Sequence, residues 1–543
     1  MSSQRTYTIT AALPYANGPM HIGHFAGVYL PADIYARYQR KCGHEVAFIS
    51  GSDEGGAAIT LQAYKEGVTP KVLVDKYHVL IKKVLSSFGV SLDIYARTSD
   101  ERHHRVAADF FKKLVKDGLL EKKEGEQYYD PMMGMFLADR YLRGRCPYCS
   151  FEEAYGDQCE SCGNTLSPQE LLDVKSAVSG ALLEKRCTTH WYLPLDKYEA
   201  WLKTWLLEGH SDWKSNVYGQ CKSWLQGGLK ARAITRDLDW GVKLPLPDSD
   251  GKVLYVWFEA PIGYISATQA WAEQVGKDWK KFWKDKDTHL VHFIGKDNIV
   301  FHCLIFPTML KMHGGYVLPY EVPGNEFMNL EGKKISTSRN HAVWLDDYLV
   351  KYPGKQDVLR YVLCANMPET KDSDFTWADF ERKNNGELVA ILGNLVHRTL
   401  LLCHKYFEGK VPTIAVMTAA DKAVSERCAT LSAAVGEHIG RFKFRQALAL
   451  WMDMGRLGNK YLAEMTPWKV WKQDPARAGA VLHVTLQLIA HMAVIGEVFL
   501  PFTMCKLGDM LGISLDQPIE SKRFDYLKEG DLLKVPEMLF EKL

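Results

Sequence analysis

The chain has 543 residues, of which 47% are hydrophobic and 24% are charged, and its formal net charge is +2. A chain of this length buries several hydrophobic cores, so a small binding module is excluded and three or four domains are expected. A net charge near zero also excludes a uniformly positive surface, so any nucleic-acid partner would have to bind local basic patches.

The N-terminal region predicts a unit of strand, helix and strand. Residues 7–11 and 46–50 are short apolar runs typical of buried strands, and a helical pattern over residues 24–40 separates them. Similar strand patterns return at residues 253–258 and 289–295. The pattern predicts an α/β, doubly wound parallel sheet that is interrupted by a long insert.

Two histidines stand where the first predicted helix begins. His21 and His24 follow the first strand and enclose Gly23. The free N–H groups and positive dipole of a helix start favour phosphate oxygens, and Gly23 would let a nucleotide approach the backbone. Taken alone, such a pair is as often a helix cap or a core feature as a set of ligand-binding residues, but its place at the carboxyl end of a strand favours a nucleotide site.

Four of the twelve cysteines form a cluster in the middle of the insert. They follow the spacing Cys146-x2-Cys149-x9-Cys159-x2-Cys162. Two such pairs supply a tetrahedral thiolate cage for Zn²⁺, and four protein ligands leave no position open for water. The spacing predicts one structural zinc ion per chain; a pair of disulfides is the alternative, which a cytoplasmic location disfavours.

The C-terminal part is predicted to be helical. After about residue 384 the strand patterns end, and apolar residues recur with helical spacing, as in Phe444, Ala447, Leu448 and Trp451. The most apolar stretch, residues 478–502, is interrupted by polar side chains, which predicts a buried helix rather than a membrane span. Because the N-terminus also lacks the features of a secretory signal, we expect a cytoplasmic protein without a membrane partner.

The chain resembles the class I aminoacyl-tRNA synthetases. Their HIGH motif appears as His21 to His24, and residues 333–338, Lys-Lys-Ile-Ser-Thr-Ser, stand where the family has its KMSKS loop. Lys334, Ser336 and Ser338 match that motif, but Thr337 replaces its second lysine, for which Lys333 is a candidate substitute. Read alone, the loop could be a solvated basic turn.

Four further segments are similar to the methionyl-tRNA synthetase family: residues 11–15, 232–238, 256–264 and 293–302. A methionine pocket needs apolar and aromatic walls and a weak donor near the thioether sulfur. The resemblance implies that the amino acid is bound by Leu13, Tyr15, Asp53, Trp257, Ala260, Pro261, Tyr264 and His302, with Asp53 pairing with its ammonium group. Taken singly, such aromatic residues are more often plain core. At position 55 this chain has glycine, where relatives usually carry a larger residue, and this departs from the family pattern.

The resemblance also implies ATP-dependent formation of methionyl-adenylate and transfer of methionine to the 3′ end of tRNA(Met). ATP would be bound by His21, Gly23, His24, Asp297, Lys334, Ser336 and Ser338, and Mg²⁺ would arrive with it. The catalytic residues would be His21, His24, Lys334 and Arg236. Arg236 would engage the substrate carboxylate or the phosphates, unless it is a surface arginine paired with Asp237 or Asp239.

Residues 384–398 are similar to the family's anticodon-reading helix. Asn394 and Arg398 lie four residues apart, so they share one helix face, and Trp468 matches a tryptophan on which an anticodon base stacks. For Trp468, packing into the core is the alternative.

The expected organisation follows. It consists of a Rossmann-type catalytic domain in two halves (1–117 and 241–326), a zinc-bearing insert (118–240), a linking region with the KMSKS-like loop (327–383) and a helical anticodon-binding domain (384–543). We expect a monomer. Two other interpretations stay open: a class I synthetase for leucine, valine or cysteine, and a paralogue without catalytic activity that only binds RNA or partners, which Thr337 suggests.

Overall fold

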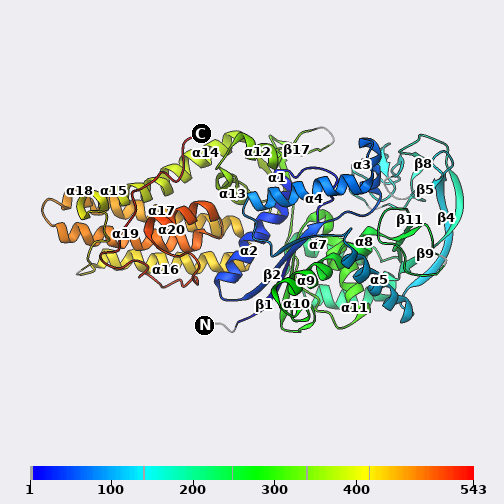
Figure 1. Ribbon diagram of the computed structural model, residues 1–543, viewed down its shortest axis with the longest axis horizontal. Coiled ribbons are helices and arrows are strands. Elements are labelled where there is room, and N and C mark those ends of the chain that lie inside the picture. Colours follow the sequence, from blue (N-terminus) through cyan, green and yellow to red (C-terminus); the bar gives the residue numbers. More distant parts are fainter. Residues whose placement is uncertain (1–3, 138–140, 165, 248, 338–339, 415) are drawn as a thin grey trace.

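The computed structural model describes the whole chain except residues 1–3, 138–140, 165, 248, 338–339 and 415. The molecule is elongated (Figure 1). A bundle of helices forms one end, the strands β4 and β9 lie at the other end, and the parallel sheet with β1 and β2 lies between them.

The central sheet is parallel, with the strand order β14-β13-β1-β2-β3, and β15 extends it beside β13. Its strands are β1 (Thr6–Ala11), β2 (Glu45–Ser52), β3 (Ile94–Arg97), β13 (Thr288–Gly295), β14 (Pro319–Glu321) and β15 (Gly324–Asn325). The helices α2 (Leu30–Lys41) and α4 (Pro70–Ser87) share a core with one face, and α5 (Glu101–Lys116), α9 (Ile262–Val275) and α11 (Phe306–His313) share a core with the other. The prediction of a doubly wound sheet is confirmed.

The prediction of a parallel strand at residues 253–258 is wrong. Residues Lys252–Leu254 form β12, which pairs antiparallel with β11 (Thr235–Asp237), and the chain then turns into α8 (Val256–Glu259). A short apolar run is compatible with a buried strand or a buried helix, and periodicity alone does not separate the two.

The insert is built from two antiparallel sheets. The larger sheet contains β4 (Glu121–Asp130), β5 (Met135–Phe136), β9 (Glu184–Leu193) and β10 (Arg232–Ala233). The smaller sheet contains β6 (Leu142–Arg145), β7 (Ala154–Tyr155) and β8 (Leu172–Ser176) and carries the cysteine cluster. Buried Cys146 and Cys159 belong to its small core, together with Leu142 and Leu166. A core of this size is typical of a segment that needs a metal staple.

A linking region leads to the helical bundle. It contains β16 (Met328–Leu330), β17 (Lys333–Lys334), α12 (Leu345–Lys351), α13 (Gln356–Ala365) and β18 (Ser373–Phe375). The bundle contains α14 (Trp377–Lys383), the π-helical η7 (Asn384–Gly393), α15 (Asn394–Phe407), α16 (Ala419–Gly440), α17 (Phe444–Met465), α18 (Pro467–Val470), α19 (Pro475–Gly496) and α20 (Pro501–Leu511).

Two helical stretches of the described chain, Trp377–Phe407 and Pro475–Gly496, are long and apolar enough to cross a membrane by length and composition. The second is a core helix of the bundle, because 94% of its apolar window is buried. The first packs against α17 and α19. The expectation of a buried helix over most of residues 478–502 is confirmed, although this stretch breaks before α20.

A buried ion pair joins α2, which packs on the central sheet, to α13 of the linking region. Arg360 of α13 is fully buried, and its Nη2 donates to Asp33 Oδ2 of α2 over 2.7 Å. Its other nitrogens donate to the carbonyl oxygens of Phe499 (2.8 Å) and Phe88 (3.0 Å). Burial alone would raise the pKa of Asp33, but Arg37 and Arg360 outweigh it and lower the pKa to about 2. Asp33 is therefore ionised wherever the protein is folded at ordinary pH.

Replacing this carboxylate should destabilise the protein. Asp33→Asn leaves the Arg360 guanidinium buried without its counter-ion, which costs about 3–5 kcal/mol. The midpoint of urea unfolding should fall clearly at pH 7, and the difference from the unaltered protein should narrow as the pH drops from about 4 to about 2, where Asp33 begins to take up its proton in the folded state. Asp453→Asn, which breaks an exposed pair with Arg456, is the control and should shift the midpoint little. Equal shifts for the two variants would contradict the role of the buried pair.

Candidate active site and metal centre

The two histidines cap the helix that begins directly after them. His21 Nδ1 accepts from the backbone N–H groups of Gly23 (3.1 Å) and His24 (3.4 Å), and His24 Nδ1 accepts from the N–H of His21 (3.3 Å). Their rings are stacked, with centroids 3.7 Å apart. Burial, with His24 beside it, lowers the pKa of His21 to about 2, and burial lowers that of His24 to about 4. A neutral ring that accepts at Nδ1 carries its proton on Nε2, so each histidine can cap the helix and still donate to a ligand.

The KMSKS-like loop lies against this turn. The N–H of Ile22 donates to the carbonyl oxygen of Val343 (3.0 Å), and that of Leu345 donates to the carbonyl oxygen of Met20 (2.9 Å). A Cβ on Gly23 would lie 3.3 Å from Ile335 Cδ1. Segments that are far apart in the sequence therefore meet at the helix start, as the resemblance to class I synthetases implies.

Within the loop, Lys333 and Lys334 are exposed on β17, and Lys334 Nζ lies 5.7 Å from the centre of the Phe327 ring. Ser336 pairs through its backbone with His341, at 3.0 and 2.9 Å. Ser338 lies outside the described residues.

Asp297 lies directly after β13 of the central sheet, whereas Arg236 lies in β11. Asp297 follows β13, and its Oδ1 lies 2.6 Å from where a Cβ on Gly295 would be, so the exposed carboxylate folds back over the end of that strand. Arg236 lies 3.7 Å from the Tyr255 ring centre and donates to the carbonyl oxygens of Ala233 (3.1 Å) and Thr235 (3.0 Å). Asp237 instead pairs with Lys252 and His190.

Most of the predicted methionine-binding residues gather beyond β1. The Tyr264 hydroxyl lies 3.0 Å from His302 Nε2, and His302 Nδ1 lies 3.1 Å from the carbonyl oxygen of Asn298. Tyr264, His302, Ala260 and Pro261 are buried, and Leu13 lies against Gly51. Burial raises the pKa of Tyr264, so its hydroxyl stays protonated. Trp257 is partly exposed and lies 5.9 Å from Phe301, at the rim rather than in the buried part.

Asp53 is tied to the same region by its backbone. Its N–H donates to the carbonyl oxygen of Pro14 (2.8 Å), and its own carbonyl oxygen accepts from Ala16 (2.9 Å), which places it beside Tyr15. Burial and the nearby Glu259 raise the pKa of its carboxyl group well above the usual value. Glu259, which lies near Asp53, was not among the residues that the sequence analysis singled out. Its only signal was a charged side chain within the apolar run 256–264.

The cysteine cluster has the geometry of a zinc site. The four Sγ atoms lie within 4.8 Å of one another, with Cys146 and Cys162 at 3.9 Å and Cys149 and Cys159 at 3.6 Å. A tetrahedron with Zn–S bonds of 2.3 Å has edges of about 3.8 Å, so the thiols fit this ion. All twelve cysteines are free thiols, and the disulfide alternative is therefore not realised. Ser150 (φ 59°) and Gly163 (φ 74°) occupy matching left-handed positions at the ends of the two turns.

Comparisons with known proteins agree over the whole chain. The family model "tRNA synthetases class I (M)" matches residues 7–400, and the model "Anticodon binding domain of methionyl tRNA ligase" matches residues 411–543. The methionine–tRNA ligases of Cytophaga hutchinsonii and of Bacteroides fragilis strain YCH46 are each 56% identical to this chain over 99% of its length, and 79% and 78% of their own lengths are covered.

The chain belongs to the class I methionine–tRNA ligase family. Membership excludes the interpretation as a leucine, valine or cysteine enzyme. The fold is shared with a solved structure of Mycobacterium tuberculosis methionyl-tRNA synthetase bound by methionyl-adenylate, at a TM-score of 0.82 and 22% identity, covering 99% of this chain and 100% of that one.

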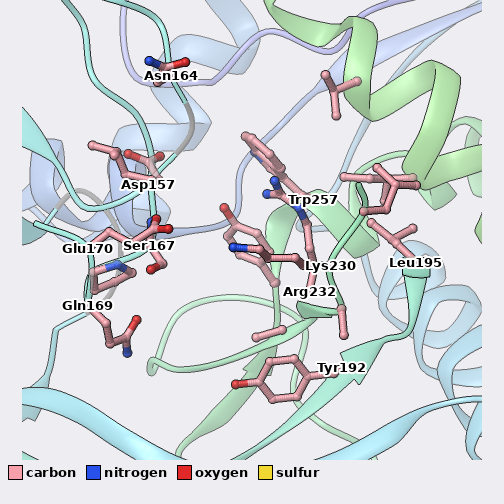
Figure 2. Close-up of a pocket in the computed structure, with 18 of the residues that line it drawn as sticks. Asp157, Asn164, Ser167, Gln169, Glu170, Tyr192, Leu195, Lys230, Arg232 and Trp257 are labelled. Carbon is pink, nitrogen blue, oxygen red and sulfur yellow. The ribbon is translucent and has the colours of Figure 1, made fainter. Parts of the chain in front are cut away.

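A cleft of about 930 Å³ separates the cysteine-bearing part of the insert from its larger sheet and adjoins Arg236, Tyr255 and Trp257. Figure 2 shows Asp157, Ser167, Gln169 and Glu170 on one side, and Lys230, Arg232 and Trp257 facing them. The Arg232 guanidinium lies 5.2 Å from the Trp224 ring centre on the second side. One wall is therefore acidic and polar, and the other is basic and aromatic. The sequence analysis did not foresee this cleft.

A smaller pocket of about 460 Å³ lies between the second cysteine turn and the KMSKS-like loop. Residues 160–163 line one side, and Lys296, Phe327 and Lys334 line the other. The cysteine cluster is thus close to a loop expected to act in catalysis.

In the bundle, Arg398 and Trp468 meet at one surface. The guanidinium of Arg398 lies 3.9 Å from the Trp468 ring centre. Trp468 is only partly buried, and Asn394 is exposed one helical turn before Arg398. An aromatic ring stacked on a guanidinium offers a surface for an unpaired base.

Metal analysis tests the cysteine cluster. We expect one zinc ion per chain by elemental mass spectrometry of the purified protein, and Cys149→Ala should lower this content strongly, because only three thiolates remain. Loss of the ion should also increase protease cleavage within residues 142–176, whose core is small. Cys187→Ala removes an exposed cysteine outside the cluster and should change neither measurement. Full zinc content in Cys149→Ala would overturn the assignment.

Proposed function

We propose that this chain activates L-methionine with ATP to form methionyl-adenylate and then transfers methionine to the 3′ end of tRNA(Met). The observation that carries the proposal is the contact of the KMSKS-like loop with the His21–His24 turn, together with the buried side chains of Tyr264 and His302, which contact each other. This arrangement provides phosphate donors on two sides and buried aromatic side chains against which an apolar side chain can pack.

In the proposed first step, a carboxylate oxygen of methionine attacks the α-phosphorus of ATP, and pyrophosphate leaves. In the second step, a hydroxyl group of the terminal ribose attacks the carbonyl carbon of the adenylate, and AMP leaves. Catalysis then depends on positioning and on stabilising the charge of the leaving phosphates. Magnesium, bound with ATP, supplies charge neutralisation on the phosphate oxygens.

We assign the phosphate contacts to the Nε2–H groups of His21 and His24 and to Lys334, with Gly23 giving close backbone access. Asp297, which folds over Gly295 at the end of β13, is placed to bind the ribose. Successive residues of a strand face opposite sides, so Lys333 points away from Lys334. This argues against Lys333 as a substitute for the lysine that Thr337 replaces.

We assign the methionine side chain to the pocket formed by Leu13, Ala260, Pro261, Tyr264 and His302. The Tyr264 hydroxyl and the His302 ring are the weak polar partners that a thioether needs. Trp257 and Tyr15 close the pocket from its rim, where they are more exposed. Arg236 faces the same opening from the insert and remains our candidate for the carboxylate or the phosphates.

We assign tRNA to two surfaces. The unpaired 3′ end enters the cleft between the two parts of the insert, where the aromatic and basic wall near Trp224 and Arg232 suits bases and phosphates. The anticodon binds the bundle at Asn394, Arg398 and Trp468. The zinc ion has a structural role. The monomeric state, the cytoplasmic location and the proposed domain boundaries stay predictions.

Pyrophosphate exchange tests the activation step. With ATP and each of the twenty amino acids, we expect exchange with methionine alone. His24→Ala removes one phosphate donor and should slow exchange by about 10²–10³-fold, while the dissociation constant for methionine changes less than about twofold. No exchange with any amino acid would instead support the paralogue without catalytic activity. A large loss of methionine affinity in His24→Ala would mean that this histidine has another role.

The two RNA surfaces can be separated by a pair of tryptophan variants. Trp468→Ala should weaken tRNA binding by about 1–3 kcal/mol, the value of one stacked base, and leave exchange unchanged. Trp224→Ala should slow transfer from preformed adenylate at saturating tRNA and leave tRNA affinity nearly unchanged, because only the 3′ end meets the cleft. Filter binding and single-turnover transfer measure the two effects. If both variants changed affinity and transfer alike, the division of the RNA between these surfaces would be wrong.

A further inference from the structure

The floor of the amino-acid pocket contains a carboxylate to which the resemblance gave no role. Glu259 ends α8 and is 2% exposed. Its Oε2 lies 2.7 Å from His103 Nε2, and His103 Nδ1 lies 3.1 Å from Ser266 Oγ. Burial lowers the pKa of His103 to about 4, so the imidazole is neutral and the contact with Glu259 is a hydrogen bond. One oxygen of Glu259 is therefore held in place by a buried partner.

The other oxygen occupies the space that a side chain at position 55 would need. A Cβ on Gly55 would lie 2.6 Å from Glu259 Oε1 and 3.9 Å from Asp53 Oδ1. A free glutamate tip could move aside, but this one is buried and bonded to His103 through its second oxygen. Glycine at position 55 is therefore what allows the carboxylates of Glu259 and Asp53 to face the same space.

Apart from His103, which lies against Glu259 Oε2, these two carboxylates have no basic side chain as a partner within the described parts of the chain. No lysine or arginine nitrogen there lies within 4.0 Å of either group, whereas the neighbouring Glu54 pairs with Arg97 at 3.0 Å. Burial and mutual repulsion raise the pKa of Asp53, and burial together with Glu54 raises that of Glu259. Two buried carboxyl groups in this situation keep protons until a cation replaces them.

Asp53 lies close to the residues predicted to hold the thioether. Asp53 is close enough to Tyr264 to contribute to the raised pKa of that hydroxyl, and the Tyr264 side chain also meets the backbone of Leu13. An amino acid whose side chain lies against Tyr264 would thus have its α-ammonium group near the two carboxylates. The ammonium is a small cation with three donors, which suits two facing carboxylates.

We propose that Glu259 binds the α-ammonium group of the amino acid together with Asp53, and that Gly55 is the residue that admits the Glu259 carboxylate to this position. The inference rests on the proposed activation of methionine and adds a second anionic contact to it. It also explains the departure at position 55, because a larger residue there would exclude this orientation of Glu259.

The test compares methionine with 4-(methylthio)butanoate, which is methionine without its amino group. Dissociation constants for both are measured by titration calorimetry on the full chain. Glu259→Gln keeps the size of the side chain and a hydrogen bond to His103 but removes the charge. This variant should weaken the binding of methionine at least tenfold. Its affinity for the analogue should stay within about twofold of that of the unaltered protein, or improve. If Glu259 had only a structural role, its replacement would weaken the binding of both ligands alike.

Position 55 supplies the reciprocal test. Gly55→Ala should weaken the binding of methionine more than that of the analogue, because the new Cβ displaces Glu259 Oε1. Adding Glu259→Asp, which withdraws the carboxylate by one methylene group, should restore much of the methionine affinity that Gly55→Ala loses. Gly219→Ala in α7 (Ser215–Gln226) is the matched control, since a Cβ there meets open space, and it should change neither affinity.

Three results would overturn the proposal: parallel losses for both ligands in Glu259→Gln, methionine affinity within twofold of the unaltered protein in that variant, or a double variant no better than Gly55→Ala. Exchange by the unaltered protein tests methionine activation separately. A normal exchange rate together with any of these three results would reject only the role of Glu259 and Gly55.

Discussion

The active site depends on a backbone pairing between two distant segments. The hydrogen bonds between Ile22 and Val343 and between Leu345 and Met20 bring the KMSKS-like loop to the turn that contains the histidines. Backbone groups make these bonds, so they tolerate changes of side chain in the loop. Thr337 can therefore differ from the family pattern without loss of the arrangement, because the loop is held from residues 343–345 rather than through its motif.

Buried carboxyl groups occur in two kinds of electrostatic environment in this protein. Asp33 meets Arg360 and Arg37 and is stabilised as an anion, which lowers its pKa. Asp53 and Glu259 meet each other, and their pKa values are raised. A satisfied pair of this kind joins elements of structure, whereas carboxylates that lack a cation are typical of a site where the cation is the ligand.

Much of the fold could be predicted from local patterns. The first two strands are short runs, buried after their first residue, on either side of an amphipathic helix, and the cysteine spacing is typical of a tetrahedral metal site. Residues 253–258 were misread because an apolar run of six residues does not reveal whether it packs as a strand or as a helix. The first cysteine turn uses Ser150 in a left-handed conformation, which composition did not suggest.

The floor of the pocket could not be predicted in the same way. Glu259, His103 and Gly55 come from three distant parts of the chain, and their relation is one of volume and hydrogen bonding rather than spacing. The sequence shows that position 55 carries a glycine instead of a larger residue. It does not show which side chain occupies the space that the larger residue would fill. The cleft near Trp224 could not be predicted from the sequence for the same reason, since its walls come together only after the insert has folded.

The helical stretch that starts at the histidines has a mechanical consequence. From Ile22 it continues through a π-helical turn, Phe25–Tyr29, into α2, which ends at Lys41, a length of about 30 Å. Lys41 Nζ donates to the carbonyl oxygen of Leu515, just beyond α20 at the base of the bundle, over 2.5 Å. One continuous helical segment thus begins at the proposed nucleotide site and ends against the anticodon-binding domain, so a tilt of that domain would shift the two imidazoles.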